Sequence, residues 1–157
     1  MFGRRKHQEA AAGWPASRDG RRRVLIENAD GSIQTAAERI LREAGYDVAL
    51  CGGVETHRNR RCPLVETGEC DLTGGADVIV HSLNVSGPGA TDVLRALRKE
   101  HPTTPVVVEI SAQRLVQLAS ELEGCFVVPA PVTEQRLLES VEAALAGAEP
   151  PPVGAPS

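Results

Sequence analysis

The chain has 157 residues, of which 41% are hydrophobic and 3% aromatic, and its formal net charge is −4. This length and composition suit one domain with an aliphatic core, and the scarcity of aromatic side chains argues against a protein that stacks single-stranded bases. No apolar run reaches the roughly 20 residues that span a bilayer, and no secretory signal is recognisable, so we expect a cytoplasmic protein without a membrane partner.

The two ends of the chain lack the periodicity of helices or strands. Residues 1–21 mix charges with Gly, Pro and Ala, and residues 148–157 are rich in proline, so both segments are predicted to be disordered. Residues 1–23 hold seven Lys/Arg and two Asp/Glu, whereas the rest of the chain is acidic. A short basic arm is more often solvated than bound to nucleic acid, so a nucleic-acid partner is not expected. The domain itself is predicted over residues 22–147.

Between these ends, short apolar runs alternate with amphipathic stretches of helical period. In chain order, they predict strands at residues 24–26, 46–50, 77–82, 106–110 and 125–128, and helices at residues 32–44, around 93–97, at 114–121 and at 134–145. Asp30 or Ser32 can cap the first helix, and Gly45 can end it. The segment from Asn84 to Gly89 is predicted to be a plain turn, because it lacks the Gly-Lys-Ser/Thr ending of a phosphate-binding loop.

Short, continuous β-branched strands that are each followed by a helix indicate an α/β fold. Its parallel sheet is buried on both faces, which makes a three-layer, doubly wound domain with right-handed crossovers. In such folds the functional crevice lies at the carboxyl ends of the strands. The segments to inspect are therefore residues 28–30, 51–53, 82–84, 110–112 and 129–131.

The order and spacing of these elements resemble the receiver domain of bacterial response regulators, over residues 22–146. The resemblance rests on the segments RRVLIENADG, GYDVAL, ADVIVHS, DVLRALRKEHPTTPVVVEIS and PAPVTEQRLLESVEAAL. It implies a flavodoxin-like, five-stranded parallel sheet with the strand order 2-1-3-4-5.

The resemblance also implies which residues to compare with a working phosphorylation site. In a working receiver, an acidic pair after the first strand binds Mg²⁺, and an Asp that ends the third strand accepts the phosphoryl group. A Thr or Ser ends the fourth strand, and a Lys followed by Pro comes after the fifth, so that cations neutralise the phosphoryl oxygens. The corresponding residues here are Asn28, Ala29 and Asp30 after the first strand, Ser82 at the phosphoacceptor position, Ile110 with Ser111 one residue further at the hydroxyl position, and Ala130 before Pro131.

These replacements predict a degenerate site that accepts no phosphoryl group. A serine hydroxyl neither binds Mg²⁺ strongly nor attacks phosphorus without a base to activate it. His81 is adjacent to Ser82, but neighbouring residues of a strand point to opposite faces. A nucleophilic pair of Ser82 and His81 is therefore not predicted.

The connection between the second and third strands, residues 51–76, is longer than a single helix needs and contains three cysteines. Cys51, Cys62 and Cys70, with His57 nearby, have the spacings C-x10-C and C-x7-C, which match no compact zinc signature. Cys125, by contrast, is predicted to begin the fifth strand at the opposite edge of the sheet and to belong to the core.

Three interpretations of this cysteine segment stay open. The thiols can pack as small hydrophobes under a long loop. Cys51, Cys62 and Cys70 can instead hold zinc or an iron–sulfur cluster, with His57 or a carboxylate completing the site. The third interpretation is a reversible Cys62–Cys70 disulfide, favoured by the nearby Arg58, Arg60 and Arg61, which would lower a thiol pKa.

Taken together, the patterns predict a non-enzymatic, stand-alone pseudo-receiver. It would signal independently of phosphorylation by binding another protein or a second copy of itself, without a cofactor. The alternative hypothesis is a metal- or thiol-based redox sensor that uses the receiver-like domain as a scaffold.

Overall fold

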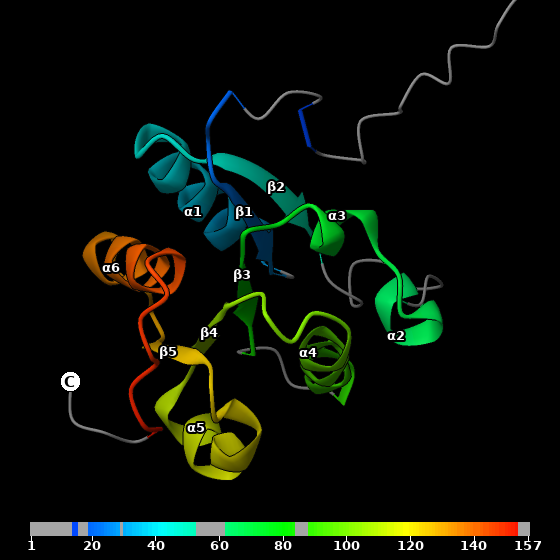
Figure 1. Ribbon diagram of the computed structural model, residues 1–157. Helices are drawn as coiled ribbons and strands as arrows, with labels where there is room; N and C mark the ends of the chain where they lie inside the picture. Colours follow the sequence, from blue (N-terminus) through cyan, green and yellow to red (C-terminus); the bar gives the residue numbers. More distant parts are fainter. Residues whose placement is uncertain (1–13, 16–18, 29, 53–61, 84–87, 154–157) are drawn as a thin grey trace, which may run out of the picture.

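The structure is a computed structural model that describes residues 14–15, 19–28, 30–52, 62–83 and 88–153 (Figure 1). Its strands are β1 (Arg23–Glu27), β2 (Asp47–Cys51), β3 (Val78–Ser82), β4 (Val106–Ile110) and β5 (Phe126–Pro129). Its helices are α1 (Gly31–Glu43), α2 (Pro63–Thr67), α3 (Asp71–Gly74), α4 (Pro88–Glu100), α5 (Ala112–Leu118), the 3-10 helix η1 (Ala119–Leu122) and α6 (Glu134–Leu145).

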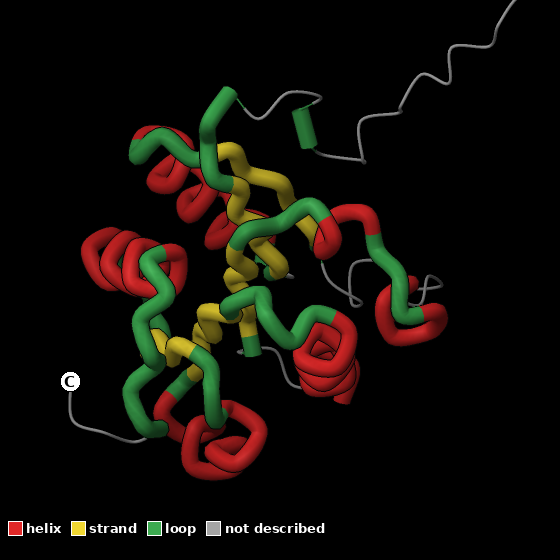
Figure 2. Tube along the Cα trace, in the orientation of Figure 1, coloured by secondary structure: helices red, strands yellow, loops and turns green. Residues whose placement is uncertain are grey.

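The five strands form one parallel sheet in the order β2-β1-β3-β4-β5, which confirms the predicted topology. Helices cover both sides of the sheet, with α1 and α6 on one side and α2, α4 and α5 on the other (Figures 1 and 2). We call these two sides the α1/α6 face and the α2–α5 face. None of the described helices is long and apolar enough to cross a membrane.

Alternation along the strands supplies apolar side chains to both faces, because successive strand residues point to opposite sides. All residues of β3 and β4 are buried, as expected for the central strands of a doubly covered sheet. The α1/α6 face buries Val24, Ile26, Val80, Leu41, Leu137 and Val141. The α2–α5 face buries two neighbouring clusters that include Leu25, Ile79, Leu64, Leu94, Leu97 and Leu122.

The cysteine segment departs from the long loop that one interpretation assumed. Residues 63–67 form α2, with Pro63 in the first turn, and residues 71–74 form α3. Proline suits the first helical turn because its missing N–H has no partner there in any case. Leu64 of α2 is buried against the α2–α5 face. Two short helices therefore close this face where the sequence pattern showed no helical period.

The ends of the domain also extend further than predicted. Trp14 lies within the segment predicted to be a disordered leader, yet it is 3% exposed and packs in the cluster of Leu25 and Leu64. Its indole N–H donates to the carbonyl oxygen of Leu72 at 3.0 Å. At the other end, Val153 packs against the cluster under α4 and α5. Both tails thus contribute at least one apolar side chain to the folded unit.

Three further boundaries differ from the sequence-based ones. Pro88 and Gly89 belong to α4 rather than to a loop, and residues 84–87 lie outside the described ranges. The helix predicted at 114–121 is divided into α5 and the tighter η1. Cys125 precedes β5 and is buried in the core at the opposite edge of the sheet from β2.

Candidate functional site

The carboxyl ends of β1, β3, β4 and β5 bring the predicted site residues to one edge of the sheet. The backbone N–H of Leu83, after β3, donates to the backbone carbonyl oxygen of Glu109 in β4 at 2.8 Å, and that of Ala130, after β5, donates to the carbonyl oxygen of Ile110 at 3.0 Å. Asn28 continues β1 by donating its N–H to Cys51 at 3.1 Å. Ala29 lies outside the described residues. The register expected from the receiver resemblance thus places Asn28, Ser82, Ile110 and Ala130 at neighbouring strand ends.

The turn between β1 and α1 is closed by side chains of the chain itself. The carboxylate of Asp30 accepts from the N–H of Ser32 at 2.9 Å, from the N–H of Ile33 at 3.1 Å and from the hydroxyl of Ser32 at 2.6 Å. Asn28 Oδ1 accepts from the Asp30 N–H at 2.9 Å. The hydrogen bond from the Ser32 hydroxyl, followed by that from the Ile33 N–H, lowers the pKa of Asp30. Asp30 is therefore the N-cap of α1, and its carboxylate accepts three hydrogen bonds within the turn.

Ser82 and Glu109 form a buried polar pair on the α1/α6 face. The β3–β4 register places them side by side, and they are 8% and 6% exposed. Glu109 was not among the predicted site residues, although a glutamate inside the apolar strand VVVEI is a visible irregularity. Burying a carboxyl group is costly unless it is hydrogen-bonded. The position of Glu109 at this edge therefore depends on hydrogen-bond partners that the fold provides.

The strand ends of β4 and β5 supply neither a phosphate-binding hydroxyl nor a cationic side chain at the expected positions. Ile110 is fully buried on the α2–α5 face. Ser111 is the N-cap of α5, because its hydroxyl oxygen accepts from the Arg114 N–H at 3.5 Å. Arg114, in turn, donates a side-chain hydrogen bond to the carbonyl oxygen of Leu83. Ser111 is thus engaged in the start of α5, and Ala130 carries only a methyl group.

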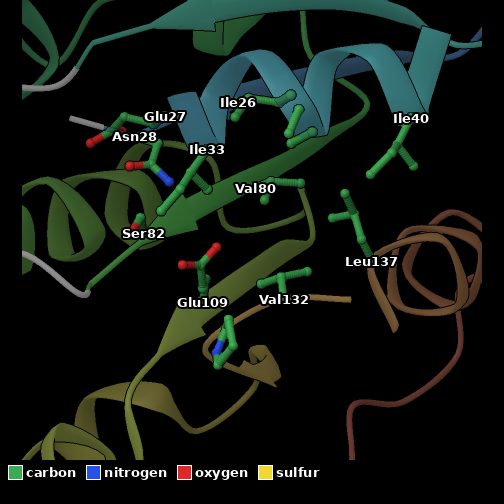
Figure 3. Close-up of a pocket in the computed structure, with 13 residues that line it drawn as sticks. Ile26, Glu27, Asn28, Ile33, Ile40, Val80, Ser82, Glu109, Val132 and Leu137 are labelled. Carbon is green, nitrogen blue, oxygen red and sulfur yellow. The ribbon is translucent and has the colours of Figure 1, made fainter. Parts of the chain in front are cut away.

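His81 lies on the other face of the sheet from Ser82, as strand alternation predicted. It is fully buried, and its Nδ1 is 3.2 Å from Oε1 of Glu27, its register partner on β1. Ser82 instead lines a cavity against α1 (Figure 3). The separation leaves His81 unable to act as a base for Ser82, and the buried Glu27–His81 pair was not anticipated from the sequence.

A cavity of about 180 Å³ lies between α1, the start of α6 and the α1/α6 face of the sheet (Figure 3). Most of its wall is aliphatic, and polar side chains gather at the carboxyl ends of β1, β3 and β4. The lining residues are Ile26, Glu27, Asn28, Ile33, Ala36, Ala37, Ile40, Val80, Ser82, Glu109, Pro131, Val132 and Leu137.

The three cysteines of residues 51–76 contact one apolar cluster. Cys51, Cys62 and Cys70 are partly buried against the cluster of Leu25 and Leu64, and all four cysteines are free thiols. Among the described residues, no group of three or more His, Cys, Asp or Glu side chains is arranged to hold a metal ion. His57, Arg58, Arg60 and Arg61 lie outside the description. Within the described residues, burial raises the pKa of the Cys62 thiol.

Burial also raises the pKa of Cys125, and a thiol reacts through its thiolate. We therefore expect iodoacetamide at neutral pH to alkylate Cys62 and Cys125 more slowly than a cysteine in a short peptide. Both rates should rise as the pH passes the ordinary thiol pKa of about 8.5. Peptide mapping by mass spectrometry after timed quenching measures each site, with the urea-unfolded chain as the control. Faster alkylation of Cys62 than of the peptide at neutral pH would instead indicate an activated thiolate.

No family model matches the chain. Among curated proteins, it is similar to the DNA-binding transcriptional regulator NtrC of Bradyrhizobium sp. (strain RP501 Parasponia), with 32% identity over 126 residues. That match covers 78% of this chain but 24% of the regulator, so the chain spans about a quarter of the relative's length.

Solved structures show the fold. A response regulator receiver domain protein from Clostridium thermocellum superimposes with a TM-score of 0.62 and 20% identity, covering 80% of this chain and 95% of that one. A response regulator receiver protein from Sinorhizobium medicae WSM419 gives 0.62 and 18%, covering 81% and 96%. The Vibrio cholerae chemotaxis protein CheY4 gives 0.59 and 19%, covering 80% and 99%. The chain therefore has the fold of response-regulator receiver domains.

Proposed function

We propose that this chain is a receiver-type signalling module that binds another protein in the cytoplasm without accepting a phosphoryl group. In this role the chain acts by binding and catalyses no reaction. The receiver fold and the match to part of a transcriptional regulator support a role in two-component signalling. The environment of Ser82, the residue at the end of β3, is the observation that supports signalling without phosphorylation.

Phosphoryl transfer to a receiver needs a nucleophilic carboxylate, a bound Mg²⁺ and a cation that neutralises the transferred oxygens. At the end of β3, this chain offers the neutral hydroxyl of Ser82. The acidic residue that remains after β1, Asp30, caps α1 through three hydrogen bonds. Glu109, a buried acidic residue, is the register partner of Ser82, so the side chain beside Ser82 is not a cation that could neutralise phosphoryl oxygens. These features together support a signalling site that stays unphosphorylated.

The redox alternative has less support. Both Cys62 and Cys125 have pKa values raised by burial, which is the opposite of the lowered pKa that regulatory thiols have. Cys51, Cys62 and Cys70 also have a structural role, because they cover the Leu25–Leu64 cluster. We therefore do not propose a second function.

Affinity capture tests the proposed mode of signalling. The tagged chain and its Ser82→Ala variant would each be used as bait in extract from the native organism, with and without acetyl phosphate and Mg²⁺. We expect both baits to retain the same partner, or a second copy of the chain, to the same extent under all conditions. A partner that is retained only after phosphodonor treatment, and only by the wild type, would contradict the proposal.

A further inference from the structure

The cavity between α1 and α6 has the composition of a ligand site. Its floor is made by the buried side chains of Ile26 and Val80, and its walls come from one side of α1 and from Val132 and Leu137 (Figure 3). Ligand sites are typically apolar concavities with a few convergent polar groups. This cavity has that arrangement, because Asn28, Ser82 and Glu109 all lie at one end of it.

The rim indicates that the cavity is reachable from solvent. Ile33, in the first turn of α1, is 41% exposed although its side chain lines the cavity. Ala36 and Pro131 also line the cavity and are exposed. The small side chains of Ala36 and Ala37 leave the space between the helix and the sheet unfilled. A ligand can thus enter between the start of α1 and Pro131.

The acidic side chains at the polar end of the cavity indicate which class of ligand it would bind. Among the described residues that line the cavity, the ionisable ones are Glu27 and Glu109, and both are acidic. Glu27 is 3.2 Å from His81, which lies on the opposite face of the sheet. Glu109 lies on the cavity side, next to Ser82. A carboxylate can accept about four hydrogen bonds, so Glu109 can accept from a bound ammonium group in addition to contacts within the chain.

The volume limits the size of the ligand. A cavity of about 150 Å³ lined by aliphatic side chains is large enough to bind benzene. The present cavity, at about 180 Å³, is slightly larger. We propose that it binds a small organic cation, a primary amine with a compact apolar body, whose ammonium group contacts Glu109 and whose body lies against Ile26, Val80 and Leu137. This binding site is independent of the partner-binding role proposed above.

Methyl NMR of the wild-type protein tests the proposal with three probes of one shape, namely benzylamine, benzyl alcohol and benzoate. We expect benzylamine to cause saturable shifts at the methyl groups of Ile33, Val80, Val132 and Leu137, but not at Val93 on the α2–α5 face. Because hydrogen bonds to a charged group contribute about 1.5–3 kcal/mol, benzyl alcohol should bind about tenfold or more weakly. Benzoate should cause no saturable shift. Equal responses to benzylamine and benzoate, or no saturation with any probe, would overturn the proposal.

Two variants separate the contributions of the charge and the cavity. Glu109→Gln should weaken benzylamine about tenfold and leave benzyl alcohol unchanged, whereas Glu69→Gln, at an exposed position between α2 and α3, changes the net charge equally and should have no effect. Ala37→Leu should fill the cavity and abolish binding of both probes. The unchanged spectrum of the α2–α5 face verifies that each variant is folded. Undiminished benzylamine binding by folded Ala37→Leu would place the ligand elsewhere and refute the assignment.

Discussion

Replacing Trp14 with alanine is expected to lower the free energy of unfolding by about 3–5 kcal/mol, the range for truncating a large buried aromatic side chain. Trp14 is 3% exposed, donates a hydrogen bond to Leu72, and lies under the guanidinium of Arg23, whose Cζ is 5.4 Å from the ring centroid. Urea denaturation followed by far-UV circular dichroism measures the change, because the variant lacks the chain's one tryptophan. A loss below about 0.5 kcal/mol, the effect of an ordinary surface substitution, would mean that Trp14 is not packed on the domain.

A double-mutant cycle with Gly75 locates the effect in this contact. A Cβ atom at Gly75 would lie 2.8 Å from Cδ1 and Nε1 of the indole, so Gly75→Ala should destabilise the wild type by displacing Trp14. In the Trp14→Ala background the same substitution should have little effect, since contacting residues are energetically coupled. Gly74→Ala is the matched control, because nothing lies within 4 Å of its added Cβ. Additive effects of the two substitutions would contradict the contact.

Placing an aspartate at position 82 is expected to destabilise the protein by about 2–4 kcal/mol at pH 8, the size of a pKa shift of a few units. The new carboxylate would be buried beside Glu109, its register partner, which is 6% exposed. Burial favours the protonated acid, and so does a second carboxyl group in the same site, because two neighbouring carboxylates repel each other. Thermal or urea unfolding of Ser82→Asp measures the loss, and Ser120→Asp at an exposed position of η1 is the control.

The pH dependence of this variant follows from the direction of the shift. A carboxyl with a raised folded-state pKa holds its proton in the folded protein after the unfolded chain has released it, so stability falls as the pH rises from about 3.9 towards the folded pKa. Ser82→Asp should therefore be less destabilising at pH 5 than at pH 8. Adding Glu109→Gln should recover part of the loss. A variant as stable as the wild type at both pH values would show that the site accommodates an aspartate.

Most element positions could be predicted because they depend on local patterns, whereas the sheet order followed from the resemblance to receiver domains. Continuous apolar strands such as VVVEI, and helices with a clear apolar stripe, report their burial directly in the sequence. The two short helices of the cysteine segment have no such stripe, since α2 and α3 contain five and four residues. They are stabilised by packing on the sheet, and so is Trp14, whose neighbours in sequence show no periodicity. Contacts between distant residues, such as Trp14 with Leu72, leave no local signal.

The sequence predicted which strand ends form the candidate site, but it did not predict all of the side chains that line the site. The strand ends place Asn28, Ser82 and Ala130 at one edge because parallel strands share a direction. The buried side chains of Glu27 and Glu109 were missed, since Glu27 lies one residue beyond the predicted strand at 24–26 and Glu109 lies inside an otherwise apolar strand. Their burial results from the helices that cover both faces of the sheet, and these contacts are seen only in the structure. The cavity likewise depends on how α1 and α6 are spaced, which no sequence period encodes.

The most direct test of the central claim is the mass of the intact protein after incubation with acetyl phosphate and Mg²⁺. A phosphorylation-competent receiver domain treated in parallel serves as the positive control and should gain one phosphoryl group. For this chain we expect an unchanged mass, because Ser82 is a neutral hydroxyl and Asp30 is engaged as the cap of α1. A mass increase of one phosphoryl group, lost again in the Ser82→Ala variant, would contradict the account.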